Sequence, residues 1–174
     1  MLDSAFDLSE RLELRKLSFN LSNELWKKWD IEDFDLNFAN WQKTKYLNVL
    51  NNDLNDNINN IPDNKGGLYL FYLNCQTIIG ITEMPLYIGR AQFTENQNLR
   101  KRIKEYFQKF IKSNERPKIT KMFKYWAEDL NIAYYVIEEN EDIRSIEKKI
   151  INSLLLPMND VIPDQEIRVA KKAF

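Results

Sequence analysis

The sequence predicts a mixed α/β fold of the α+β type: a small, mainly antiparallel three-stranded sheet flanked by helices, with an N-terminal helical extension. Two short apolar and aromatic runs, residues 68–73 and 86–90, lie close enough in the chain to pair as antiparallel strands. The segments 98–113 and 142–155 repeat apolar residues at helical spacing. A hydrophobic fraction of 44%, with 13% aromatic residues, indicates a folded chain rather than a disordered one.

Residues 1–64 form the predicted N-terminal extension, and residues 65–174 form the second domain. One helix is expected over residues 4–29 and another around residues 41–54. The leucines on the apolar side of the first helix are Leu8, Leu12, Leu17, Leu21 and Leu25. In the segment 51–64, 7 of 14 residues are asparagine, which favours a linker at this boundary.

The second domain is expected to follow the order strand, strand, helix, helix, strand, helix. Its strands are predicted at 68–73, 86–90 and 132–138, and its helices at 98–113, 118–130 and 142–155. Residues 74–84 are expected to form a loop or an extension of the first hairpin. Pro157 ends the last helix, because a proline ring cannot continue it.

The composition excludes several kinds of enzyme. The chain has no histidine, which removes Ser-His and Cys-His nucleophile pairs, histidine metal sites and imidazole bases. Carboxylates, Tyr, Lys or Arg must carry any chemistry, with a hard metal ion if one is used. Cys75 is the single cysteine, and no apolar run reaches the roughly 18–20 residues of a membrane span. These features favour a cytoplasmic protein without a membrane segment.

The net charge of −1 hides an uneven distribution. Residues 1–64 carry 7 basic and 12 acidic side chains, whereas residues 90–124 carry 11 basic and 3 acidic ones, a balance of +8. Such a basic segment can form a local phosphate-binding face, or it can be a solvated pair of helices. Lys118, Lys121 and Lys124 recur at i, i+3 and i+6, so they can share one helical face toward a nucleic acid.

Glu147 lies on the apolar face of the helix expected at 142–155. On a helical projection it falls among Ile143, Ile151 and Leu154. A carboxylate in this place needs a cation, hydrogen bonds or a raised pKa, because an isolated buried charge is very costly. An internal Lys or Arg partner would satisfy that need and is the simpler explanation of Glu147 taken alone.

Arg102 lies at the rim of the apolar stripe of the helix expected at 98–113, and Tyr106 follows one turn later. A guanidinium beside a phenol at the edge of a core is suited to grip a phosphate. The alternative is a structural ion pair, which needs no substrate.

Short motifs in the second domain resemble those of the GIY-YIG nuclease family. The tripeptide GLY at residues 67–69 is similar to the first signature of that family, and YIG at residues 87–89 to the second. The segment 99–107 (LRKRIKEYF) resembles the helix that carries the catalytic arginine in the nucleotide-excision-repair endonuclease subunit. The resemblance covers about residues 66–160, a little over half of the chain.

By this resemblance, Glu147 matches the metal-binding glutamate of the family, and Mg²⁺ or Mn²⁺ is the implied cofactor. Arg102 matches the catalytic arginine, and Tyr106 the tyrosine four residues after it. Arg90 replaces the basic residue that follows the second signature, and Asn159 matches a downstream asparagine. Arg90 and Asn159 are therefore expected to contact the substrate.

The resemblance also implies roles in phosphodiester hydrolysis. Arg102 would stabilise the charge that develops on phosphorus, and Tyr69 or Tyr87 would take a proton from the attacking water. A tyrosine needs a nearby cation for this role, since its ordinary pKa is about 10. We expect Tyr69, Tyr87, Arg102 and Glu147 to converge on one face of the sheet.

The leading interpretation is a metal-dependent DNA endonuclease of the restriction or defence kind. The N-terminal helices, with inserted loops at 74–85 and 91–98, could read sequence or form a homodimer. One alternative is a nuclease-like module that binds nucleic acid or a partner without cutting. Another is the cutting subunit of a larger assembly, docked through the N-terminal helices. A competent residue at every expected catalytic position favours an active nuclease.

Overall fold

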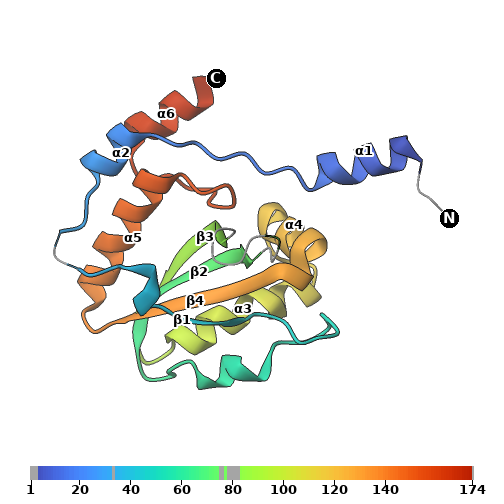
Figure 1. Ribbon diagram of the computed structural model, residues 1–174. Helices are drawn as coiled ribbons and strands as arrows, with labels where there is room; N and C mark the ends of the chain where they lie inside the picture. The colour runs from blue at the N-terminus through green and yellow to red at the C-terminus, as the bar shows by residue number, and fades with distance from the viewer. Residues whose placement is uncertain (1–3, 33, 75–76, 78–82, 174) are drawn as a thin grey trace.

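The computed structural model describes residues 4–32, 34–74, 77 and 83–173 (Figure 1). Within these residues the chain forms six α-helices and one four-stranded sheet. The strands are β1 (Gln42–Lys45), β2 (Gly66–Asn74), β3 (Glu83–Ala91) and β4 (Leu130–Ile137). The helices are α1 (Ala5–Leu14), α2 (Asn23–Lys28), α3 (Leu99–Ile111), α4 (Pro117–Trp126), α5 (Asn140–Leu154) and α6 (Gln165–Ala173). Short 3₁₀ turns lie at Phe38–Asn40, Asp56–Asn60 and Ala127–Asp129.

The sheet is antiparallel throughout, with the strand order β1-β4-β2-β3. The expected pairing of the two signature strands is confirmed, since β2 and β3 are neighbours with Tyr69 opposite Gly89. β4 lies on the other side of β2, with Tyr134 opposite Tyr69. The prediction of three strands was wrong, because β1 adds a fourth at the edge.

The helix predicted around residues 41–54 does not form. Its first part is β1, which pairs with β4 through partners such as Gln42 and Tyr134. Tyr46 follows the strand and is fully buried, and its hydroxyl donates a hydrogen bond to the Ile103 carbonyl at 2.7 Å. Ile58 and Ile61 are buried in the same core. Residues 42–61 therefore belong to the sheet and the core on which α3 packs, so the boundary expected at residue 64 does not separate two cores.

Helices cover both faces of the sheet (Figure 1). α3 and α4 pack on one face, where Tyr69, Phe71 and Tyr87 project from β2 and β3. α5 packs on the other face, against Leu68 and Ile88. The alternation follows from strand geometry, since successive side chains point to opposite faces.

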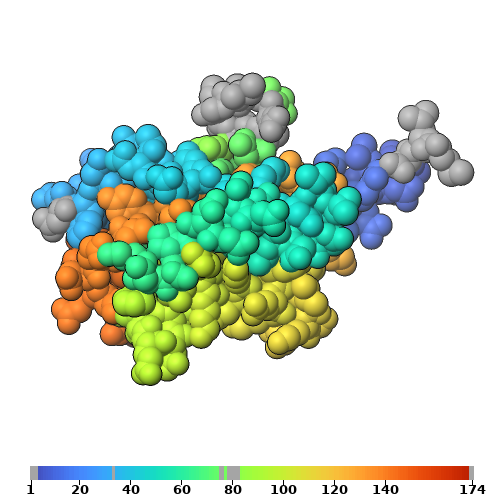
Figure 2. Space-filling view, turned by 90° about the horizontal axis from the view of Figure 1, so that it is seen from below, coloured from blue at the N-terminus to red at the C-terminus, as the bar shows by residue number. Residues whose placement is uncertain are grey.

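The N-terminal helix is shorter than expected and divided. Instead of one helix over residues 4–29, α1 and α2 flank an extended segment, and Ser22 caps α2 by accepting the Leu25 amide. α1 begins with a capping box between Ser4 and Asp7 but buries no residue. It projects from the body at the end of that segment (Figure 1), and it lies at one end of the molecule in the space-filling view (Figure 2).

Capping residues and a proline set the ends of the helices that pack on the sheet. Asn98 caps α3 by accepting the Lys101 amide at 2.8 Å, and Pro117 occupies the first turn of α4. Leu155 caps the C-terminus of α5, and its left-handed φ of 46° turns the chain back toward β3. The tip of the β2–β3 hairpin, within the loop expected at 74–85, lies largely outside the described residues.

Among the residues that the structure describes, no helix combines the length and the apolar character needed to cross a membrane.

Candidate active site

A cavity of about 380 Å³ lies where β2, β3, α3 and α5 meet. It brings together five residues singled out in the sequence, although 78 positions separate the first from the last. Its lining comprises Tyr69, Tyr87, Arg90, Ala91, Gln92, Thr94, Gln97, Arg102 and Glu147. The lining is rich in charged and phenolic groups, so it suits a polar or charged ligand.

The sequence analysis expected the catalytic candidates on one face of the sheet. Instead, they reach this cavity from both faces. Tyr69, Tyr87 and Arg102 belong to the face covered by α3, whereas Glu147 projects from α5 on the opposite face. They meet because β3 is an edge strand and because Gly89 has no side chain. A Cβ built on Gly89 would lie 2.5 Å from the Tyr69 hydroxyl oxygen, so glycine is required for the phenol to lie here.

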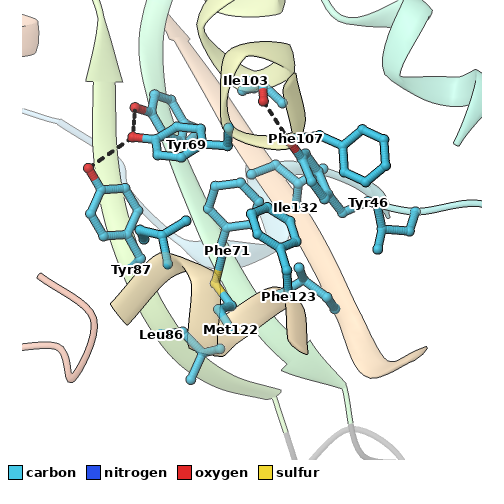
Figure 3. Close-up of a cluster of buried hydrophobic side chains, with 14 of the residues drawn as sticks. Tyr46, Tyr69, Phe71, Leu86, Tyr87, Ile103, Phe107, Met122, Phe123 and Ile132 are labelled. Carbon is cyan, nitrogen blue, oxygen red and sulfur yellow. Dashed lines mark hydrogen bonds between the residues drawn. The ribbon is translucent and has the colours of Figure 1, made fainter. Parts of the chain in front are cut away.

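Three tyrosine hydroxyls form a hydrogen-bonded chain in the wall of the site (Figure 3). The Tyr106 hydroxyl donates to Tyr87 at 3.0 Å, and 2.8 Å separates the Tyr69 and Tyr106 hydroxyl oxygens. Because each hydroxyl has one hydrogen, Tyr69 must then be the donor to Tyr106. The Tyr87 oxygen accepts at the end of the chain, and its own hydrogen is left to point elsewhere.

Burial disfavours charge on two of these phenols. It raises the pKa of Tyr69 well above its ordinary value; the neighbouring Tyr87 raises that pKa further, and Arg102 lowers it without reversing the shift. Burial likewise raises the pKa of Tyr106, with contributions from Tyr69 and Tyr87. Tyr69 and Tyr106 are therefore better suited to donate and order hydrogen bonds than to act as bases.

Arg102 occupies the position predicted for it, at the rim of the core. Its guanidinium carbon lies 5.3 Å from the centre of the Tyr106 ring. Its Nη1 donates to Glu105 at 2.8 Å, and Gln97 donates to the other oxygen of that carboxylate at 2.9 Å. The sequence analysis gave such an ion pair as the alternative to phosphate binding. Here the pair orients the Arg102 guanidinium, which also lines the cavity.

Glu147 is paired with Arg90. The Arg90 Nε donates to Glu147 Oε2 at 2.6 Å, and the two side chains are 30% and 17% exposed. Burial raises the pKa of Glu147, and Arg90 and then Arg102 lower it without cancelling the increase. Arg90 Nη1 also donates to Gln92 at 3.0 Å. Arg90, expected to contact substrate, here holds the carboxylate that the resemblance assigns to the metal.

Asn159 has a different place from the one expected. Its side chain accepts from the Ile88 amide at 3.0 Å and donates to the Ile88 carbonyl at 2.9 Å. Met158 adds a backbone bond to Leu86. The buried side-chain amide is thus hydrogen-bonded to the outer edge of β3, and it holds in place the strand that carries Tyr87 and Arg90.

The three lysines of α4 do not line the cavity. Lys118 Nζ lies 3.5 Å from Asp160 and donates to the Asn159 carbonyl at 3.4 Å. Lys121 Nζ contacts the carbonyl of Lys16 in the N-terminal segment at 3.5 Å, and Lys124 lies over the Tyr125 ring. Among these three lysines, Lys118 is the one in contact with Asn159, the residue that is bonded to β3.

Several residues at the site escaped the sequence analysis. Gln92, Thr94 and Gln97 come from the loop expected as an insertion at 91–98, and Asn140 clamps that loop through both polar atoms of its side chain to Phe93. Arg116 lies over the Tyr87 ring with its guanidinium carbon 5.3 Å from the centre. The sequence feature that could have indicated Arg116 is its position directly before Pro117, at the start of a helix in the basic segment 90–124.

The donor set can accept one hard metal ion with few protein ligands. Within the described part of the chain, no three His, Cys, Asp or Glu side chains gather at one point. Glu147 alone would then hold Mg²⁺ or Mn²⁺, which suits an ion that keeps several waters. The partly buried carboxylate faces a cavity large enough for a hydrated ion beside a phosphate, so the residues fit this group.

A second cavity, of about 460 Å³, lies on the α5 face of the sheet. Its walls are apolar and aromatic, including Phe38, Trp41 and Tyr72, and Glu83 is the acidic residue in its lining. Although it is larger, it lacks the converging cations of the first cavity. A negatively charged ligand therefore fits the smaller cavity better.

Comparison with known proteins adds no relative: no family model, no curated protein and no solved structure matches this chain.

Proposed function

We propose that the protein is a metal-dependent endonuclease that hydrolyses phosphodiester bonds in DNA, acting in the cytoplasm as a restriction or defence nuclease. The observation that carries this proposal is a single cavity that gathers Tyr69, Tyr87, Arg90, Arg102 and Glu147. Two arginines and a carboxylate at one cavity suit a phosphodiester substrate with a bound cation better than a neutral ligand.

The chain's own groups divide the work. Arg102 would bind a non-bridging phosphate oxygen and stabilise the charge that develops in the transition state. Glu147 would hold the metal ion, which would supply Lewis-acid polarisation of the phosphate. A metal ion bound to both carboxylate oxygens would displace Arg90 from Glu147 Oε2, and the guanidinium would then be available for the substrate.

Tyr87 is the tyrosine best placed to take the proton from the attacking water. Its oxygen ends the hydroxyl chain, and Tyr106 donates to it. To take that proton, Tyr87 must first be a phenolate, whose negative charge would be stabilised by the Tyr106 hydroxyl and by the Arg116 guanidinium over its ring. When it accepts the proton, Tyr87 would become a neutral phenol and the water a hydroxide directed at the phosphate. Tyr69 is disfavoured, because burial raises its pKa.

The test is cleavage of supercoiled plasmid by the purified protein in Mg²⁺ or Mn²⁺, with chelator and with Ca²⁺ as controls. Nicked or linear product that requires Mg²⁺ or Mn²⁺ supports the proposal. An RNA of matched sequence, assayed in parallel, tests the choice of DNA. Binding of duplex DNA without cleavage in either ion would instead favour the non-cleaving module.

A further inference from the structure

Two arginines flank the hydrogen-bonded pair formed by Tyr87 and Tyr106. Arg102 lies over the Tyr106 ring and Arg116 over the Tyr87 ring, each with its guanidinium carbon 5.3 Å from the ring centre. The ring centres are 5.7 Å apart and the hydroxyls are bonded at 3.0 Å. The site thus has a cation on each side of its phenols, although the sequence motifs account for Arg102 alone.

Arg116 is held loosely by its acidic neighbours. Its Nε lies 3.4 Å from Glu115 and its Nη1 lies 3.5 Å from Asp160, whereas the pairs at Arg90 and Arg102 measure 2.6 and 2.8 Å. The short bond of Glu115 goes instead to the Arg116 backbone amide, at 2.8 Å. With 41% of its side chain exposed, the guanidinium keeps donors for an outside anion.

Arg116 shares one of its two acidic partners with a second cation. Lys118 shares the Asp160 carboxylate with Arg116, also at 3.5 Å, so two cations face one anion there. Burial lowers the pKa of Arg116, but its interactions with the Tyr87 side chain raise that pKa above its ordinary range. The guanidinium therefore stays charged beside the site at every pH at which the protein is folded.

We propose that Arg116 binds a phosphate of the DNA backbone next to the scissile one, on the Tyr87 side of the cavity, and so positions the strand for cleavage. This inference rests on the proposed function. Arg102 would then act on the reacting phosphate, while Arg116 sets where the strand lies. A bound strand would exchange the two long contacts of Arg116 for a shorter, charge-assisted bond to phosphate.

The experiment uses the full chain carrying Glu147→Gln, so that DNA is bound without being cut. The affinity for a labelled duplex is measured over a range of salt concentrations for this protein and for added Arg116→Ala, Arg116→Lys and Arg168→Ala. Arg168 is an exposed arginine on α6 and serves as the matched control. The same three arginine changes in the cleaving protein give KM and kcat separately.

Loss of one phosphate contact should reduce the slope of log K against log salt by about 0.9 and weaken binding about tenfold in Arg116→Ala. KM should rise more than kcat falls, Arg116→Lys should restore most of the slope, and Arg168→Ala should match the parent. A parent-like slope and KM in Arg116→Ala would overturn the role of Arg116 while leaving the proposed function standing. Failure of the unchanged protein to bind or cut DNA would overturn both.

Discussion

At the scale of single residues, the ion pair between Arg90 and Glu147 determines whether the Glu147 carboxylate is available to a metal ion. At 2.6 Å it occupies one oxygen of the carboxylate that we assign to the metal. The sequence raised two explanations for a charge on an apolar helix face, an internal partner and a site residue. The structure shows the internal partner, Arg90, and places the carboxylate at the cavity. Arg90 neutralises Glu147 in the metal-free protein, so metal binding must compete with it.

Arg90→Gln should therefore bind Mn²⁺ about tenfold more tightly at neutral pH, because the competing cation is gone. Burial raises the pKa of Glu147 and Arg90 lowers it, so the substitution should raise it further. Protons then compete for the carboxylate at higher pH. Mn²⁺ affinity should fall on acidification sooner in the variant than in the parent.

Titration of Mn²⁺ followed by electron paramagnetic resonance, from mildly acidic to neutral pH, measures both effects. Arg168→Gln is the control for loss of one positive charge. Equal affinity in the parent and in Arg90→Gln at neutral pH would show that Arg90 does not compete for Glu147.

At the scale of elements, β3 is the part that positions the site. It carries Tyr87, Gly89 and Arg90, and its outer edge is bonded by Met158 and Asn159 rather than by another strand. The left-handed turn at Leu155 brings these two residues back to the sheet. The asparagine singled out in the sequence thus acts on the backbone of the strand, and through it on the phenol and guanidinium.

Asn159→Ala should lower the free energy of unfolding by about 1–3 kcal/mol, because it leaves the buried Ile88 amide and carbonyl without their partner. DNA affinity measured well below the unfolding temperature should stay near that of the parent. Chemical denaturation, with exposed Asn60→Ala as the control, measures the first effect. Loss of DNA affinity with unchanged stability would return Asn159 to the role of substrate contact.

The elements differ in how well local pattern predicts them. β2, β3, β4, α3, α4 and α5 have long apolar stripes or aromatic runs, so their periodicity was sufficient. β1 is the short polar segment Gln42–Lys45, which joins the sheet by backbone pairing with β4 and leaves most of its side chains exposed. After it, Leu47, Leu50 and Leu54 recur at i, i+3 and i+7, which is a helical spacing, and the predicted helix was wrong for that reason.

The residues of the site also differ in how well the sequence predicts them. Tyr69, Tyr87, Arg102 and Glu147 were recognisable by motif, and the structure brings them to one cavity. The pairing of Arg90 with Glu147 and the approach of Arg116 to Tyr87 depend on contacts between distant segments, which no local spacing encodes. The loop clamp made by Asn140 is of the same kind.

At the scale of the whole molecule, the N-terminal segment crosses from one end of the fold to the other. α2 packs through Leu25 and Trp29 beside α5 and α6. Leu17 packs on the main core, next to Lys16, whose carbonyl contacts Lys121 of α4. Beyond that point α1 buries nothing, and Leu8 and Leu12 are 51% and 63% exposed. The apolar side predicted for one long helix is therefore used at Leu17 and Leu25 and left open on α1.

A chain shortened to begin at Arg15 should unfold within about 2 °C of the full chain, since α1 contributes no buried contact. If α1 joins a second copy or another protein, as expected for the N-terminal helices, the deletion should change assembly without changing stability. Differential scanning calorimetry with light scattering measures both quantities. A large drop in the unfolding temperature of a monomer would show that α1 packs on its own chain.

The central claim is that the cavity around Glu147 is a metal-dependent phosphodiesterase site, and the rate of plasmid cleavage by Glu147→Gln tests it most directly. The substitution keeps the shape of the side chain but removes a charged metal ligand, so cleavage in Mn²⁺ should be abolished while the fold and duplex binding persist. Glu141→Gln, an exposed change on the same helix, should cleave like the parent. Cleavage at the parental rate by Glu147→Gln would contradict the account.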